Sequence, residues 1–159
     1  MTAVEKLEVS FSILGPADAP ALAMLVQSQT PAYMRTFHPF PFDEKELSEC
    51  LKANRQDVWW GIEADGQLAG LVMLRGADEG YEHPAFGILV AEEFAGRGLA
   101  RQALRHCFAW CRSRGIPKIL LKVETANVRA RNLYLDEGFE LVGVCSASGQ
   151  DVMEWCVKI

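Results

Sequence analysis

One stretch of the sequence decides how the chain is built, and it reads Ala85-Phe86-Gly87-Ile88-Leu89-Val90-Ala91-Glu92-Glu93-Phe94-Ala95-Gly96-Arg97-Gly98-Leu99-Ala100-Arg101. An apolar strand runs through a short turn into the glycine-rich start of a long helix. Gly96 and Gly98 allow backbone conformations that aim successive N–H groups outward, and the helix start adds unpaired donors and a positive dipole end. We therefore expect a phosphate or pyrophosphate to bind here, with Arg97 and Arg101 supplying charge. Taken alone, the glycines are equally compatible with a plain tight turn.

Two other phosphate-binding signatures fail on spacing. The P-loop pattern Gly-x-x-x-x-Gly-Lys-Ser/Thr does not occur in the sequence. The dinucleotide fingerprint needs a third small residue where Arg101 stands. Glu124, at the end of the next predicted strand, would suit a ribose-binding acid. A dinucleotide-binding oxidoreductase therefore stays open as an alternative.

Hydrophobic periodicity and turn residues divide the rest of the chain into strands and helices. Strands are predicted over residues 7–14, 58–63, 68–74, 85–91, 119–124, 139–145 and 152–157. Helices are predicted over residues 21–29, from the capping residue Asp43 onward, over 99–114 and over 128–137. The strand at 85–91 is almost wholly apolar and is expected to be buried on both faces. Residues 30–42 contain three prolines and are expected to form a loop. The order β-α-α-β-β-β-α-β-α-β-β predicts a mixed α/β sheet with helices on both faces.

Composition narrows the class of protein. At 159 residues, with 50% hydrophobic and 23% charged residues, the chain suits one globular domain over residues 1–159. A net charge of −5 argues against nucleic-acid binding, which usually requires a basic domain. No apolar run is long enough to span a membrane, and no secretory signal is recognisable. Five scattered cysteines without a CxxC pair favour reduced thiols in a cytoplasmic protein and no metal site.

A second motif follows the glycine turn, and it reads Asn127-Val128-Arg129-Ala130-Arg131-Asn132-Leu133-Tyr134-Leu135-Asp136-Glu137-Gly138-Phe139. With the strand before it, this motif is similar to a signature of the GNAT superfamily of acyl-CoA-dependent N-acetyltransferases, Asn-x-x-Ala-x-x-Leu-Tyr-x-x-x-Gly-Phe. The family's phosphate signature, Arg/Gln-x-x-Gly-x-Gly/Ala, falls on residues 95–100. Gly98 and Ala100 match it, whereas Ala95 replaces the leading Arg/Gln and weakens one side-chain contact. The two signatures stand in the family's order and separation, and the resemblance in element order covers residues 7–159.

The resemblance implies a fold, a donor substrate and a set of binding residues. The fold would be an α+β arrangement, a mostly antiparallel twisted sheet of about seven strands with four helices. The donor would be acetyl-CoA, with no metal. The backbone of Ile88, Leu89 and Val90 would pair with the pantetheine arm like an added strand. The pyrophosphate would be held by Gly96, Arg97, Gly98, Ala100 and Arg101. Asn127 would bond the pantetheine end, and Tyr134 would lie near the CoA sulfur.

The expected reaction is direct attack of an amine on the acetyl group in a ternary complex. Tyr134 is the predicted general acid for the departing thiolate, and the backbone N–H of Val90 could stabilise the carbonyl oxygen. Glu124 is the predicted general base, with Glu82, His83 and His38 as alternatives and a water relay as a further one. A catalytically silent acyl-CoA-binding module is the competing interpretation that the substitution at Ala95 leaves open.

The resemblance implies an acceptor site lined by the first two helices, their loop and the closing hairpin, and the loop contains an aromatic segment. The run Thr36-Phe37-His38-Pro39-Phe40-Pro41-Phe42 alternates aromatic residues with histidine and prolines, which suits either a stiff packed loop or a platform for a flat-faced acceptor. Phe37, His38, Phe40 and Trp60 are the predicted substrate-binding residues. We expect a small-molecule amine as acceptor, with an amino sugar as one candidate, and a protein or peptide amine as the alternative. The resemblance also suggests a homodimer.

Overall fold

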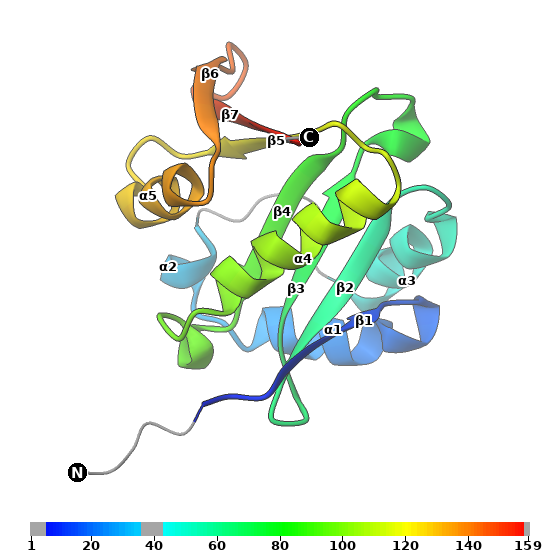
Figure 1. The fold of residues 1–159 in the computed structure, drawn as a ribbon. Helices are drawn as coiled ribbons and strands as arrows, with labels where there is room; N and C mark the ends of the chain where they lie inside the picture. The colour runs from blue at the N-terminus through cyan, green and yellow to red at the C-terminus, as the bar shows by residue number, and fades with distance from the viewer. Residues whose placement is uncertain (1–5, 36–42, 158–159) are drawn as a thin grey trace, which may run out of the picture.

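The chain folds around one sheet of seven strands (Figure 1). The computed structural model describes residues 6–35 and 43–157. The strands are β1 (Val9–Ile13), β2 (Val58–Ala64), β3 (Gln67–Arg75), β4 (Ala85–Val90), β5 (Lys118–Val123), β6 (Glu140–Val144) and β7 (Asp151–Cys156). The helices are α1 (Ala19–Gln27), α2 (Pro31–Met34), α3 (Glu44–Ala53), α4 (Leu99–Ser113) and α5 (Val128–Asp136). Three short 3-10 turns, η1 (Pro16–Asp18), η2 (Ala77–Glu79) and η3 (Glu92–Phe94), complete the elements.

The order of strands across the sheet is β1-β2-β3-β4-β5-β7-β6. Neighbouring strands pair in antiparallel fashion, except that β4 and β5 run parallel. A parallel neighbour requires a crossover connection, and α4 supplies it between β4 and β5. The predicted mixed, mostly antiparallel sheet of about seven strands is confirmed.

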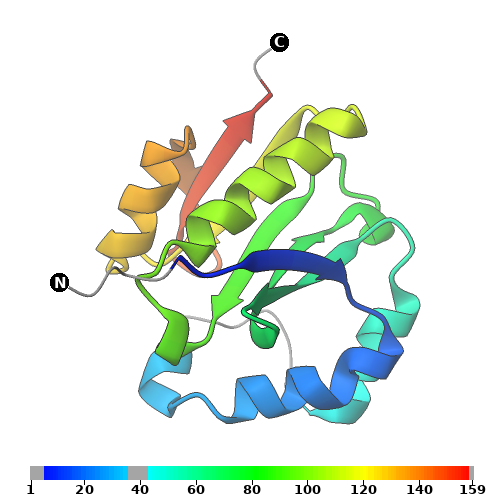
Figure 2. The same cartoon turned by 60° about the horizontal axis from the view of Figure 1, so that its bottom comes forward.

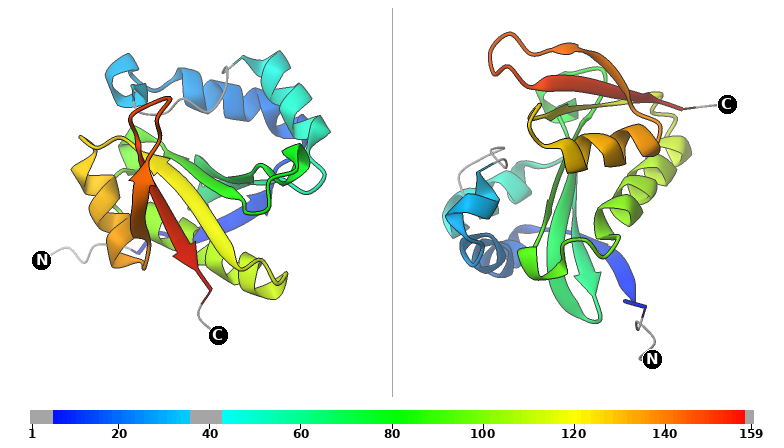
Figure 3. Two further views of the ribbon diagram at one scale, coloured as in Figure 1. Left: turned by 90° about the horizontal axis from the view of Figure 1, so that it is seen from above. Right: turned by 90° about the vertical axis from the view of Figure 1, so that its left-hand side faces the viewer.

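Helices cover both faces of the sheet, as the sequence predicts. The helices α1 and α3 lie on one face and α4 on the opposite one (Figures 2 and 3). The buried stripe of α4 consists of Leu99, Ala103, Leu104, Cys107, Phe108 and Cys111. Phe108 stacks on Trp155 of β7, with ring centroids 4.0 Å apart. Tyr134 of α5 meets the Phe86 ring of β4 edge-on, which places α5 on the same face as α4.

The described residues form one helix more than the four predicted. Residues 30–42 were expected to form a loop, yet α2 occupies their first part. The Thr30 side chain caps this helix by accepting from the Tyr33 N–H at 3.3 Å, and Pro31 takes the first helical position, where its missing N–H costs nothing. Pro31 therefore starts a helix here. Residues 36–42 lie outside the described part of the chain.

The prediction that β4 is buried on both faces is wrong. Phe86 and Leu89 are buried, but Ala85 is exposed and the strand's other residues are intermediate. The strand is apolar because it lies at the centre of the sheet. It is partly accessible because β5, its neighbour on one side, stays beside it for only a short distance.

Candidate active site

The strands β4 and β5 separate shortly after they meet, and this opens the centre of the sheet. Their pairing consists of Ala85 opposite Leu120, with the Leu120 N–H donating to the Pro84 carbonyl at 2.9 Å. On its other side β4 stays paired with β3 along its whole length. One long edge of β4 therefore faces a cleft instead of a strand.

The peptide groups along this edge can be assigned from the alternation of the ladder. The Ala91 N–H, just beyond β4, donates to the Ala69 carbonyl beside β3 at 2.7 Å. Because successive residues of a strand point their peptide groups to opposite sides, those of Ile88 and Val90 point away from β3. The Tyr33 hydroxyl of α2 donates to the Val90 carbonyl, in agreement with this assignment. The cleft edge of β4 thus presents backbone donors and acceptors to a ligand.

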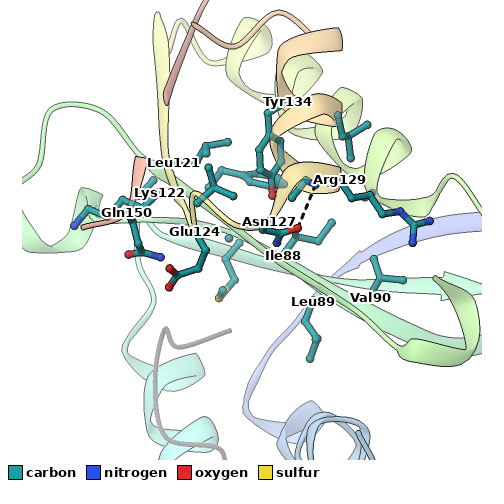
Figure 4. Close-up of a pocket in the computed structure, with 18 of the residues that line it drawn as sticks. Ile88, Leu89, Val90, Leu121, Lys122, Glu124, Asn127, Arg129, Tyr134 and Gln150 are labelled. Carbon is teal, nitrogen blue, oxygen red and sulfur yellow. Dashed lines mark hydrogen bonds between the residues drawn. The ribbon is translucent and has the colours of Figure 1, made fainter. Parts of the chain in front are cut away.

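A pocket fills the space between the two strands and extends over both ends of the gap (Figure 4). It is lined by β4, by the C-terminal half of β5, by the start of α4 and by one side of α5. Of the residues predicted to bind the donor, it brings together Ile88, Leu89, Val90, Gly96, Gly98, Ala100, Arg101, Asn127 and Tyr134. Arg97 is exposed and is not among the lining residues.

The start of α4 forms one end of the pocket. Gly96 and Gly98 have φ values of 77° and 85°, in the left-handed region that only glycine enters at little cost. Gly98 is the N-cap of α4 and provides no side-chain cap. The N–H groups of the first turn therefore keep their hydrogen-bonding capacity for a ligand. A Cβ added to Gly98 would meet no protein atom within 4 Å, so the space in front of this turn is open.

The basic side chains at this end are arranged differently from the sequence-based expectation. Arg101 was expected to contact pyrophosphate, but its guanidinium bonds to Glu137 and lies 3.8 Å from Asp136. Burial alone would raise the pKa of Glu137, yet hydrogen bonds from Arg105 and Arg101 hold it below its ordinary value. Arg101 thus lines the pocket with its charge already balanced, and it ties α4 to α5.

Arg129 is a basic residue of the pocket that the sequence analysis did not single out. A Cβ built on Gly96 would lie 2.7 Å from its Nη2 atom, so the guanidinium lies directly against the glycine turn. The residue is exposed, and its position as the second residue of α5 places it one turn before Leu133. Arg129 lies within the second motif, so its positive charge was visible in the sequence. The sequence alone does not show that the start of α5 packs against the glycine turn.

Asn127 caps α5 at the edge of the pocket. Its Oδ1 atom accepts from the Ala130 N–H at 3.3 Å, the bond drawn as a dashed line in Figure 4. The backbone N–H of Asn127 also donates to the Glu124 carbonyl at 2.9 Å. Since the cap uses the amide oxygen, the amide nitrogen is the atom that can donate to a ligand. The residue therefore serves the helix and faces the pocket at once.

Tyr134 reaches from α5 into the pocket (Figure 4). It is 9% exposed, and its ring packs against Phe86 and Phe139 at centroid distances of 6.1 and 5.8 Å. Burial raises the pKa of Tyr134 to about 12. The phenol therefore stays protonated at neutral pH and can act as a hydrogen-bond or proton donor.

The opposite end of the pocket is built from side chains of β5 and of loops. Lys122 and Glu124 line it from β5 and Gln150 from the segment before β7. His83, an alternative base, lies 3.8 Å from Glu82 and also lines the pocket. Tyr33 lies at the α2 side, and burial raises its pKa, with Glu92 adding to the effect.

The predicted acceptor residues are only partly described. Phe37, His38 and Phe40 lie outside the described residues. Trp60 is 2% exposed and packs edge-on against His106 and Trp110 of α4, at 4.8 and 5.1 Å. It is not among the residues that line the pocket. Its burial beneath α4 does not support the expected contact with an acceptor.

Two other kinds of site receive no support within the described residues. Over residues 6–35 and 43–157, no three His, Cys, Asp or Glu side chains gather closely enough to hold a metal ion. In the same ranges, no helix combines the length and apolar character needed to cross a bilayer.

Comparison with known proteins gives matches over most of the chain. Residues 22–139 match the family model described as the acetyltransferase (GNAT) family. The acetyltransferase ECA0875 of Pectobacterium atrosepticum is 29% identical over 115 residues, which are 72% of this chain and 79% of that protein. Rat N-acetyltransferase 8B is 26% identical over 108 residues, 64% of this chain and 47% of that protein. The chain thus spans about half the length of this rat relative.

Solved structures share the fold at low sequence identity. A chimera of the Vibrio cholerae spermidine N-acetyltransferase SpeG superposes with a TM-score of 0.75 at 20% identity, covering 93% of this chain and 95% of that one. The Thermoplasma acidophilum PaiA N-acetyltransferase, in complex with coenzyme A, gives 0.75 at 15% identity over 94% and 99%. A Salmonella typhimurium acetyl transferase that modifies the N-terminal serine of ribosomal protein L7/L12 gives 0.78 at 17% identity over 95% of both chains. Because these names include a polyamine and a protein terminus, the shared fold does not determine the acceptor.

Proposed function

The chain belongs to the acetyltransferase (GNAT) family, and on that premise we propose that it transfers the acetyl group of acetyl-CoA to a primary amine of a small molecule. The observation that carries the proposal is the opening between β4 and β5, which has an uncapped helix start at one end and a buried, protonated tyrosine in its wall. A donor with an anionic tail and a reactive thioester head matches both features.

We call the end of the pocket at the cleft edge of β4 and the start of α4 the donor end. Its backbone geometry suits a long, phosphorylated thioester. The N–H and carbonyl of Ile88 and the N–H of Val90 face the cleft and can bond the amides of a pantetheine arm. The turn at Gly96 and Gly98 and the first N–H groups of α4 can bond a pyrophosphate. Arg129 adds positive charge beside this turn, and the Asn127 amide nitrogen can bond the arm further along. Each of these groups lines one continuous pocket.

Acetyl transfer needs two proton movements, and the pocket holds a candidate group for each. The amine nitrogen forms a bond to the acetyl carbon while the carbon–sulfur bond breaks. Tyr134 gives its hydroxyl proton to the departing sulfur and is reprotonated from solvent. The proton lost by the amine goes to the Glu124 carboxylate, directly or through water. A backbone N–H on the cleft edge of β4, such as that of Val90, stabilises the charge on the carbonyl oxygen.

We call the opposite end of the pocket, away from the start of α4, the acceptor end. Its shape supports a small acceptor. The residues there come from the segment between β3 and β4, from β5 and from the segment between β6 and β7, so they surround the gap on several sides. The amino-sugar hypothesis rested on Phe37, His38 and Phe40, which lie outside the described residues. The structure therefore adds no support for that particular acceptor.

The first test is calorimetric titration of the purified protein with acetyl-CoA, with NAD as the comparison ligand. We expect saturable binding of acetyl-CoA alone. Release of CoA in the presence of a panel of amines then distinguishes an enzyme from a silent acyl-CoA-binding module. Binding of NAD instead of acetyl-CoA would contradict the donor assignment, and donor binding without turnover of any amine would favour the silent module.

A further inference from the structure

The floor of the acceptor end has a defined set of polar side chains. Lys122 and Glu124 are two positions apart on and just beyond β5, so they point to the same face of the sheet, roughly 6.5 Å apart along the strand. Continuing the ladder from Val123 opposite Asp151 places Gln150 opposite Glu124. All three side chains line the pocket, and Figure 4 shows them projecting from the same part of it.

Lys122 forms no ion pair with an acidic side chain among residues 6–35 and 43–157. Glu154 of β7 lies on that face but pairs with Lys118 at 3.3 Å. Lys122 itself is exposed into the pocket. Its charge also reaches the turn after β6, where hydrogen bonds from Ser148 and Ala147, with a contribution from Lys122, lower the pKa of Cys145 to about 7.

Charges of both signs line this end of the pocket. The net charge of the protein is −5, and the basic Arg35 and Lys122 line the acceptor end together with the carboxylates of Glu79 and Glu124. Glu124 is the carboxylate on the floor beside Lys122. A substrate with several positive charges would be repelled by Lys122. A substrate with one amine and one anionic group would find a partner for each.

We propose that the acceptor is an amino carboxylic acid, whose amine lies beside Glu124 and Gln150 and whose carboxylate is bound by Lys122. This inference rests on the proposed function and narrows its acceptor. The spacing along β5 suits an amine and a carboxylate separated by about two to four carbon atoms. Lys122 acts here as a specificity-determining residue, because it selects the anionic group and leaves the acetyl transfer itself to the groups near the thioester.

The test compares acceptors that differ only in the group away from the amine. The panel is β-alanine and 4-aminobutyrate, their carboxamides, and 1,3-diaminopropane, each assayed by release of CoA from acetyl-CoA. We expect kcat/KM for the acids to exceed that for the amides by about tenfold, as for loss of one charge-assisted contact, and the diamine to be poorest. Equal rates for acids and amides, or a preference for the diamine or for a peptide N-terminus, would overturn the inference and leave the acetyltransferase proposal standing.

Variants of Lys122 assign the preference to this residue. Lys122→Gln should bring the acid-to-amide ratio close to one, and Lys122→Glu should favour the diamine over the acids. Lys52→Gln is the matched control, since it removes the same charge from the exposed last turn of α3, outside the pocket lining. An acid preference that survives in Lys122→Gln would overturn the assigned role. Failure of every amine to be acetylated would contradict the proposed function, and the inference would fall with it.

Discussion

The two ends of the pocket are built from different parts of the polypeptide. At the donor end the groups offered to a ligand are backbone groups, from the cleft edge of β4 and from the first turn of α4. At the acceptor end they are side chains, such as Lys122, Glu124 and Gln150. A backbone-built site depends on conformation and tolerates changes of side chain. A side-chain-built site can change its ligand with a single substitution.

The substitution at Ala95 illustrates the difference. The family signature places Arg or Gln at this position, yet here the turn keeps Gly96 and Gly98 at positive φ and leaves the helix start uncapped. The geometry that presents the N–H groups is intact without the basic side chain. Arg129, from a helix later in the chain, brings a guanidinium to the same turn. Substitutions at each end should therefore differ in their effects.

Removal of the Tyr134 hydroxyl should have the largest effect, because chemistry at the junction of the two ends depends on one side chain. Tyr134→Phe should lower kcat by about 100-fold, the usual scale for a general acid, with little change in acetyl-CoA affinity. Since the pKa of Tyr134 is about 12, the tyrosine is protonated throughout the neutral range. The loss should therefore be the same at pH 6 and pH 9, as measured by steady-state CoA release. Turnover equal to that of the parent protein at both pH values would remove Tyr134 from the mechanism.

Loss of the Glu124 carboxylate should have a smaller effect. Glu124→Gln should lower kcat by about 30-fold at neutral pH, less than the full contribution of a general base because water can carry the amine proton. Activity should recover partly at higher pH, where more of the amine is already unprotonated. Glu140→Gln is the control, because Glu140 is an exposed carboxylate of β6 outside the pocket lining. Full activity of Glu124→Gln at neutral pH would exclude Glu124 as the base.

A side chain at the glycine turn should weaken donor binding by about tenfold. In Gly98→Ala, the left-handed backbone conformation costs about 1–2 kcal/mol, and the new methyl group enters the open space in front of the helix start. Gly66→Ala is the matched control, because Gly66 also has positive φ and open surroundings but lies in the turn between β2 and β3. Titration calorimetry should show weaker acetyl-CoA binding in Gly98→Ala alone. Equal losses of stability with unchanged donor affinity in both would mean that the turn is only structural.

Restoring the family's side chain at position 95 should have the smallest effect. Ala95→Gln should tighten acetyl-CoA binding by about threefold, the scale of one additional exposed hydrogen bond. The modest gain follows from a site whose main contacts are backbone groups. Titration calorimetry under the same conditions provides the measurement. A gain of 100-fold or more would show that this end depends on side chains as much as the other does.

The same contrast explains what could be predicted from the sequence. The strand, the turn and the helix start at this end were predictable because glycines, an apolar strand and an amphipathic helix are local signals for the backbone conformation they impose. The roles of Arg101 and Arg129 were not accessible. Glu137, which binds Arg101, lies 36 positions away, and Arg129 reaches the glycine turn only after α5 folds against it. Which charged side chains from different elements meet depends on how the elements pack, and the spacing of residues in the sequence does not reveal it.

Two further differences have similar causes. An apolar run such as residues 85–91 indicates a central strand, but it carries no information on how long the neighbouring strand stays beside it. The apolar run alone therefore does not reveal the short pairing of β4 with β5, which creates the pocket. Trp60 was expected near an acceptor because of its chemistry, whereas the alternation of β2 turns it beneath α4. For Phe37, His38 and Phe40 the prediction stays untested.

The gap in the centre of the sheet has a consequence for the stability of the folded protein. Apart from the Val90 carbonyl, which accepts from the Tyr33 hydroxyl, the backbone groups that β4 exposes there are left to solvent until a ligand bonds them. Bound acetyl-CoA would therefore replace the missing neighbour of this strand. A ligand that binds only the folded chain raises its melting temperature in proportion to the logarithm of the ligand concentration once the site is saturated. Hydrogen exchange at Ile88 and Val90 should slow in the same titration. The protein would then be most durable while its donor is plentiful and shorter-lived when the supply falls.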